Sequence, residues 1–201
     1  SEAFARERAV FDELHGVVDV LGGIIAEHEL LALLGRDESG RNYIRFLLVL
    51  GDPFVKLKED DEFHHRWHVS AERARAVHEA LRALAERLGL NDLVSESDIV
   101  GMFLETLGDH AEIERREEFA RRYLGISKMI GRNPLGEWGH ALSPNIRVKG
   151  VRDYAYLAIR RHGSPMHFTE VAREITRLFG RSAHEATCHN ELIKDARFVL
   201  V

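Results

Sequence analysis

Cysteine, long apolar runs and a chain-wide excess of positive charge are all scarce or missing in this 201-residue sequence. The one cysteine, Cys188, cannot form an internal disulfide, so we expect a reducing, cytoplasmic compartment. No apolar run approaches the roughly 18 residues that a membrane helix requires, so we expect no membrane segment. No secretory signal opens the chain, and because it begins with Ser1 rather than Met we expect a fragment or a processed product.

Charge is unevenly distributed along the chain. The net charge of −5 excludes a basic footprint over the whole protein. Residues 1–146 carry 18 Lys and Arg against 27 Asp and Glu, whereas residues 147–201 carry 10 against 6. We therefore expect only the C-terminal quarter to attract phosphate groups.

Signatures of the common enzyme classes are absent as well. The sequence contains no phosphate-binding P-loop, no dinucleotide-binding GxGxxG, no GxSxG nucleophile elbow and no CxxC pair. Its many carboxylates belong to segments predicted to be solvated helix surfaces. We therefore expect a protein that is not an enzyme and that carries no cofactor.

A weak repeat of about 72 residues runs through the chain. Each copy begins with an amphipathic helix whose apolar residues follow the helical period and which ends near a glycine. The apolar stripes are Val10, Leu14, Val17 and Leu21; Val77, Leu81, Leu84 and Leu88; and Val151, Tyr154, Ala155, Ala158 and Ile159. A short extended stretch and two more helices follow, with the third helix expected at 39–50, 110–124 and 182–194.

After the third helix each copy turns extended. In the first two copies the sequence pattern predicts a β-hairpin, whereas the third reaches Val201 with one strand, RFVLV. Three helices followed by a hairpin form the element order of a winged helix-turn-helix; the alternative is a generic helical domain with surface hairpins. We expect a mainly α fold with small β-hairpins (α+β), arranged as tandem winged helix-turn-helix repeats over 1–69, 70–146 and 147–201.

The third copy resembles a known family. Its segments GSPMHFTEVAREI, AHEATCHNELIKD and RFVLV correspond in order to the second helix, the third helix and the first wing strand of the HARE-type winged helix-turn-helix domain. That family includes the N-terminal domain of the delta subunit of bacterial RNA polymerase, and similar modules occur in bacterial proteins with a sigma-factor-like helix-turn-helix. The resemblance implies a DNA-binding or polymerase-associated role in transcription.

The third helix of this copy contains SAHEATCHNEL, where Ser182 and Glu185 predict a capping box. A helical wheel turns Cys188 toward the core and places a polar face opposite. In a helix-turn-helix such a face enters the major groove, where Asn pairs with adenine, and Lys and Thr contact bases or phosphates. Two arginines beside the helix are expected to clamp phosphates. The predicted DNA-binding residues are Arg181, His184, Thr187, His189, Asn190, Lys194 and Arg197. The alternative is an ordinary solvated helix face.

The histidines raise the further alternative of a metal site. His184 and Cys188 lie four residues apart on one helix, but a structural zinc site usually needs four ligands and the chain has no second cysteine. We therefore expect no metal. A second cluster, FHHRWHV at 63–69, predicts a wing strand. Its inward side is expected to carry Phe63, Trp67 and Val69, and its outer side His64, Arg66 and His68, facing a partner or solvent.

Three functional hypotheses follow from these patterns. The first is a DNA-binding protein of the bacterial transcription apparatus that contacts DNA with the third helix of the C-terminal copy. The second is a protein-interaction module whose acidic first two copies dock on RNA polymerase or another transcription factor without direct DNA contact. The third is a metal-dependent regulator that uses the histidines. Winged helices serve both of the first two purposes, so fold alone does not separate them.

Overall fold

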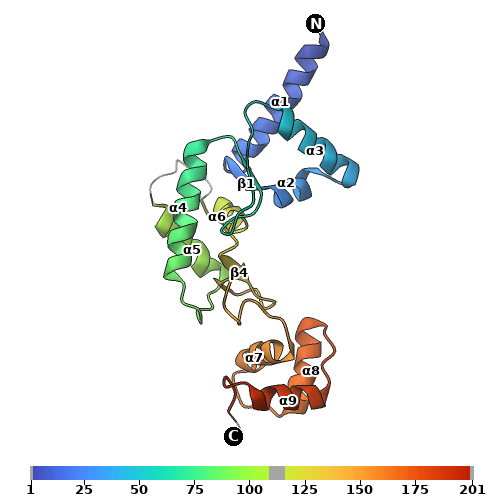
Figure 1. The fold of residues 1–201 in the computed structure, drawn as a ribbon, viewed down its shortest axis with the longest axis vertical. Helices are drawn as coiled ribbons and strands as arrows, with labels where there is room; N and C mark the ends of the chain where they lie inside the picture. The colour runs from blue at the N-terminus through green and yellow to red at the C-terminus, as the bar shows by residue number, and fades with distance from the viewer. Residues whose placement is uncertain (1, 109–115, 200–201) are drawn as a thin grey trace. The chain divides into compact units, whose positions relative to one another are not determined.

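The computed structural model describes residues 2–108 and 116–199 as a mainly helical chain with small antiparallel sheets (Figure 1). The α+β class predicted from the sequence is confirmed at this level. Contacts divide the chain into two compact units, residues 1–88 with 97–130 and residues 89–96 with 131–201. Within the described ranges, no helix combines the length and the apolar character needed to cross a bilayer.

The first unit begins with a helix, a strand, two helices and a β-hairpin. These elements are α1 (Glu2–Val20), β1 (Ile24–Ala26), α2 (Glu27–Leu34), α3 (Glu38–Leu50), β2 (Val55–Leu57) and β3 (Arg66–His68). Strand β3 lies between β1 and β2 and is antiparallel to both, so Trp67 pairs with Ile25 on one side and Lys56 on the other. The element order is the one that the repeat pattern predicts for the first copy.

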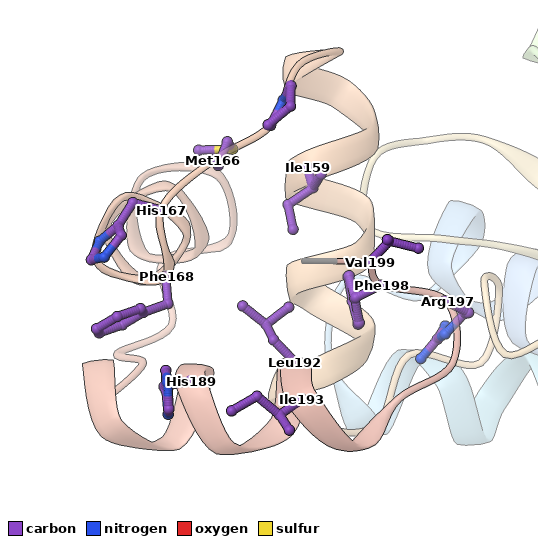
Figure 2. A pocket seen from close by; sticks show the side chains of 11 residues that line it. Ile159, Met166, His167, Phe168, His189, Leu192, Ile193, Arg197, Phe198 and Val199 are labelled. Carbon is purple, nitrogen blue, oxygen red and sulfur yellow. The ribbon is translucent and has the colours of Figure 1, made fainter. Parts of the chain in front are cut away.

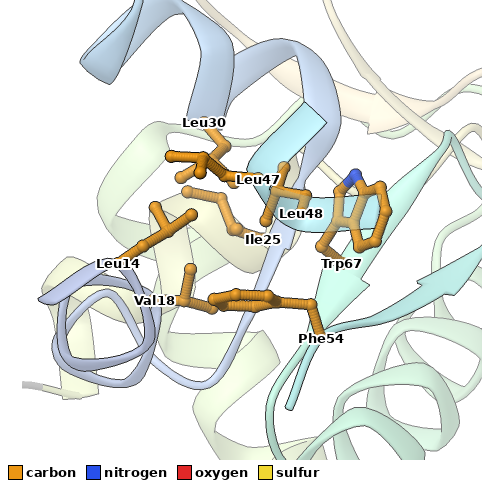
Figure 3. Packing of buried hydrophobic residues seen from close by; sticks show 8 residues of the cluster. All are labelled: Leu14, Val18, Ile25, Leu30, Leu47, Leu48, Phe54 and Trp67. Atoms are coloured by element: carbon orange, nitrogen blue, oxygen red, sulfur yellow. The ribbon is translucent and has the colours of Figure 1, made fainter. Parts of the chain in front are cut away.

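A continuous apolar core fills the space between these elements (Figure 3). It includes buried residues from α1, β1, α2, α3 and the hairpin: Leu14, Val18, Ile25, Leu30, Leu47, Leu48, Phe54 and Trp67. The indole of Trp67 donates a hydrogen bond from Nε1 to Glu27 Oε2 at 2.8 Å, which satisfies the polar atom of this buried side chain. Trp67 is buried in this core and Val69 packs against it, as expected for the inward side of the strand.

The second copy repeats this element order. It comprises α4 (Ala71–Arg87), α5 (Glu96–Leu107), α6 (Arg116–Leu124), β4 (Ile130–Arg132) and β5 (Trp138–His140). Val94, just before α5, pairs antiparallel with Trp138 of β5. The predicted stripe of α4, from Val77 to Leu88, is buried as expected. The start of the third helix, predicted at 110, lies outside the described residues.

The first hairpin is covered on both sides, so the prediction that its outer side faces a partner or solvent is wrong for two residues. Arg66 is 5% exposed and His68 is 7% exposed. Arg66 donates from Nε to Nε2 of His78 on α4 at 2.8 Å. The backbone N–H of His64 donates to the carbonyl of Ile126 at 3.0 Å. The second copy covers this side of the hairpin, which a pattern confined to one copy does not reveal.

The third copy is a bundle of three mutually packed helices, α7 (Val151–His162), α8 (Phe168–Phe179) and α9 (Glu185–Lys194). The predicted start of the last helix at Ser182 is wrong. Helix α9 begins at Glu185, and His184 is its N-cap residue, since the His184 carbonyl accepts the Cys188 N–H at 2.9 Å.

No strand forms over 197–199, the described part of the predicted wing strand RFVLV. A strand needs a partner for its backbone groups, and the described chain brings none beside these residues. The winged helix-turn-helix assignment of the three copies stays a prediction.

Candidate nucleic-acid interface

Helix α9 is fixed against α7 and α8 by a buried inner face. Cys188 is fully buried and packs in the cluster that contains Tyr154, Val171 and Ile175. Burial, with a smaller contribution from the Glu185 carboxylate, raises the pKa of the Cys188 thiol. The raised pKa disfavours the thiolate, which is the form of cysteine that binds metals. In the described part of the chain, no three His, Cys, Asp or Glu residues gather where they could hold a metal ion.

The outward face of α9 carries three of the predicted contact residues. Thr187, Asn190 and Lys194 are all exposed, on the side away from buried Cys188. Glu191, beside Asn190, is turned toward α7, where its carboxylate lies 3.6 Å from Nε of Arg152. The structure therefore brings together a hydroxyl, an amide and an ammonium group on one open surface.

Two more predicted residues lie at the N-terminal end of α9. Gly180 is the C-cap of α8, with a φ of 62° in the left-handed region, and the chain then runs through Arg181 to His184. Arg181 is exposed, and its guanidinium carbon lies 5.0 Å from the ring centroid of Tyr154. The His184 side chain is exposed and forms no capping hydrogen bond. His184 therefore lies at the positive end of the α9 dipole, where an anion is favoured, whereas the Arg181 side chain lies against Tyr154 of α7.

The other two predicted residues have different surroundings. His189 is exposed, and its ring meets Phe168 of α8 edge-on, with the centroids 4.9 Å apart. Arg197 donates to Asp195 at 2.6 Å and to Asp153 at 2.9 Å. The Asp195 contact raises the pKa of Arg197, and the guanidinium lowers the pKa of the Asp195 carboxyl. The carboxylates of Asp153 and Asp195 thus offset the charge of Arg197. This favours an ion pair within the protein over the expected contact with phosphate.

Several cations of the C-terminal copy have no such partner. Lys194, Arg161, Arg173 and Arg181 are exposed, and none of them forms an ion pair with a carboxylate among the described residues. Their charges remain available to phosphate. The sequence predicted the excess charge of residues 147–201 but not the individual roles of Arg161 and Arg173, since summed charge does not show which cations are paired.

The N-cap residue of α8 was not predicted from the sequence. His167 is its N-cap, and Nδ1 of that ring accepts the backbone N–H of Thr169 at 3.4 Å. Glu170 closes the capping box by accepting the His167 N–H at 3.1 Å. The signal was present as His-x-x-Glu, but His is not among the usual N-cap residues.

The third helix of the first copy exposes a different chemistry. Leu47 and Leu48 anchor α3 in the core, while four large apolar side chains of α3 face solvent. These are Tyr43, Phe46, Val49 and Leu50, at 55%, 57%, 70% and 55% exposure. Such a group of exposed apolar residues is typical of a protein-contacting surface.

Comparison of the chain with known proteins gives no match to any protein-family model, curated protein or solved structure. The HARE-type resemblance therefore depends on the segments quoted above. Functional inference depends on the side chains that α3 and α9 expose.

Proposed function

We propose that this protein is a DNA-binding component of the bacterial transcription apparatus, built from tandem winged helix-turn-helix repeats, and that α9 contacts the bases of duplex DNA. The observation that carries the proposal is the orientation of α9. Because Cys188 holds its inner face in the core, Thr187, Asn190 and Lys194 face outward together. No catalytic step, cofactor or metal enters this role, and the cytoplasm is its natural compartment.

The chemistry of this face suits the major groove. Asparagine offers the donor and acceptor that match adenine, lysine donates to guanine or phosphate, and threonine contacts phosphate or the thymine methyl group. Arg181 and the unpaired Arg161 and Arg173 supply positive charge in the same compact unit. Phosphate contacts of this kind position a protein on DNA, while base contacts give specificity.

The arrangement of the first two copies supports the tandem repeat. In the first, β3 lies between β1 and β2 after three helices, and in the second Val94 pairs with β5 in the corresponding way. This is the element order expected of a winged helix-turn-helix. The C-terminal copy shares the three helices.

Fluorescence anisotropy with duplexes selected from a random library tests the proposal. Replacing both Asn190→Ala and Lys194→Ala is expected to weaken binding of the selected duplex at least about tenfold, since a good bidentate base contact is worth about 1–3 kcal/mol. A matched control, Asn91→Ala with Lys58→Ala, removes the same groups from exposed positions in the acidic first 146 residues and is expected to leave binding unchanged. Equal affinity of both double variants rules out α9 as the contact helix.

A second candidate function is supported by the apolar surface of α3. The acidic first two copies can dock on RNA polymerase or another transcription factor through Tyr43, Phe46 and Val49. The test is binding to purified core RNA polymerase, measured by surface plasmon resonance. The variant Tyr43→Ser with Phe46→Ser is expected to lose this binding while keeping DNA affinity, and Val20→Ser, exposed on α1 at 70%, serves as its control. Unchanged binding of the double variant removes α3 from this role.

A further inference from the structure

The outward face of α9 is centred on Asn190. The inner side of the helix is fixed by Cys188, which is fully buried, and by Leu192, which packs against the same cluster. His189 meets Phe168 edge-on, and Figure 2 shows His189 and Leu192 turned toward the start of α8 and the helix α7. Because successive residues of an α-helix are rotated by about 100°, Asn190 lies opposite Cys188 and Leu192. Its amide therefore points most directly away from the bundle.

Methyl groups flank Asn190 on this face. Ala186 precedes it by four residues and Thr187 by three, so both are its neighbours on the helix surface, one on each side. Both are exposed and belong to the first turn of α9. In a helix-turn-helix, the N-terminal residues of the recognition helix contact the base edges. An amide and two methyl groups are therefore presented together by the part of α9 that would lie nearest to the bases.

The cations around α9 are placed away from this centre. Guanine is commonly contacted by Arg or Lys. The guanidinium carbon of Arg181 lies 5.0 Å from the ring centroid of Tyr154, and His184 lies at the helix end that favours an anion. Lys194 is the last residue of the helix, about 6 Å along the axis beyond Asn190. These positions suit phosphate better than a guanine at the centre of the site.

The carboxylates of α9, a helix that the structure describes throughout, also face away from Asn190. Cytosine is contacted by Glu or Asp, which accept from its amino group. Glu191 is turned toward α7, where its carboxylate lies 3.6 Å from Nε of Arg152. The Glu185 carboxylate is close enough to Cys188, on the inner side, to raise the pKa of its thiol. The groups left at the centre are those that match adenine and thymine.

We propose that α9 recognises an A·T-rich site in duplex DNA, with Asn190 hydrogen-bonded to an adenine and with Ala186 and Thr187 against the methyl groups of neighbouring thymines. Asn190 lies about 4.5 Å beyond Thr187 and about 6 Å beyond Ala186 along the helix axis. Base pairs are stacked about 3.4 Å apart, so the three side chains contact neighbouring pairs. The proposal rests on the DNA-binding function proposed above and adds Ala186 to the residues that determine specificity.

Two base analogues test these contacts on the unaltered protein. Duplexes are selected from a random library by the whole chain, and the selected sites are expected to share an adenine flanked by thymines on either strand. Replacing a thymine by deoxyuridine removes its methyl group, so affinity is expected to fall about fourfold, the value of one buried methyl group. Replacing the adenine by 7-deazaadenine removes the N7 acceptor, so affinity is expected to fall about fivefold. Both analogues alter only the major groove.

Protein variants connect each loss to a side chain. Ala186→Gly is expected to lose the preference for thymine over deoxyuridine at one position, and Thr187→Ser, which keeps the hydroxyl, is expected to lose it at another. Asn190→Ala is expected to bind the adenine and 7-deazaadenine duplexes equally. The matched control Ala71→Gly changes an exposed alanine in the first turn of α4 and is expected to keep both preferences.

The outcomes separate this proposal from the function on which it rests. If the whole chain enriches no duplex and binds none saturably, DNA binding itself is wrong and this proposal falls with it. DNA binding stands and A·T recognition by α9 is overturned by any of three results. These are selected sites centred on G·C pairs, equal affinity for thymine and deoxyuridine duplexes, or a thymine preference that survives in both Ala186→Gly and Thr187→Ser.

Discussion

Helices α3 and α9 hold the same place in the element order of their copies, yet their outward faces differ in chemistry. Helix α3 exposes Tyr43, Phe46 and Val49, whereas α9 exposes Thr187, Asn190 and Lys194. Each is anchored through a buried inner face, formed by two leucines in α3 and centred on a cysteine in α9. The buried inner face thus determines which side of each helix is exposed. The residues on that exposed side determine the class of partner.

The difference follows the distribution of charge along the chain. The apolar face of α3 belongs to the acidic first copy, with 8 basic against 14 acidic residues over 1–69. The polar face of α9 belongs to the segment with excess positive charge. Phosphate is attracted to the second and repelled by the first, which agrees with the proposed DNA contact at α9 and the proposed protein contact at α3.

The largest effect is expected from Phe63, which packs the first hairpin against α4. Phe63 is fully buried, and its ring lies 4.5 Å from that of His78 on α4. Phe63→Ala is expected to lower the free energy of unfolding by about 3–5 kcal/mol, since it leaves a cavity at this junction. Urea denaturation measures this loss. The exposed control Phe46→Ala on α3 is expected to change stability by less than about 0.5 kcal/mol. A small loss for Phe63→Ala would mean that the hairpin is not packed as described.

A smaller effect is expected from the inner face of α9. Cys188→Ser places a hydroxyl in an apolar site with no described partner and is expected to cost about 1–3 kcal/mol of unfolding free energy. Its matched control, Thr187→Ser, changes the neighbouring exposed residue and is expected to be nearly neutral. Thermal denaturation compares the two variants. If Thr187→Ser proves the more damaging, the helix is rotated and the DNA-contact face is wrongly assigned.

The smallest effect concerns pH. Burial, together with the Arg66 and Arg82 guanidinium groups, lowers the pKa of His78 to about 4, against 6.5 when unfolded. His78 is therefore neutral in the folded protein, whereas the unfolded chain takes up a proton as the pH falls below 6.5. Stability is expected to fall from pH 6.5 to about 4, and because solvent screens this partly exposed residue its total contribution is expected to be only about 1 kcal/mol.

The contribution of His78 is measured by denaturation at a series of pH values. His78→Gln keeps a hydrogen-bond acceptor for Arg66 but does not titrate, so its stability is expected to fall less steeply over the same range. Carboxylates such as Asp60, whose pKa is lowered in the fold, keep a slope of the same sign in both proteins. Identical slopes would show that His78 titrates normally.

Local periodicity was sufficient to predict the helices and their buried faces. Leu81 and Leu84 of α4 and Cys188 of α9 are buried as the helical spacing indicated, because a residue on the inner stripe of an amphipathic helix packs into whatever core it meets. The element order of the first two copies followed from the same pattern. The position of β3 between β1 and β2, where Trp67 pairs on both sides, was not predicted separately and follows from the hairpin.

The sequence pattern did not predict contacts between segments that lie far apart in the chain. The burial of Arg66 depends on His78 and on the segment around Ile126, which belong to the next copy. The pairing of Arg197 with Asp153 joins residues 44 positions apart and removes a cation that summed charge had counted as available. The start of α9 at Glu185 shows a competition between local caps, in which His184 rather than Ser182 precedes the helix.

The salt dependence of DNA binding tests the central claim most directly. Binding of the whole chain to a selected duplex is measured by fluorescence anisotropy over a range of salt concentrations, for the wild type and for Lys194→Ala. If α9 contacts DNA, log affinity falls linearly with log salt concentration, and the slope of the variant is smaller by about 1 if Lys194 contacts phosphate. An unchanged slope together with unchanged affinity of the variant, or no duplex binding by the wild type, contradicts a DNA contact by α9.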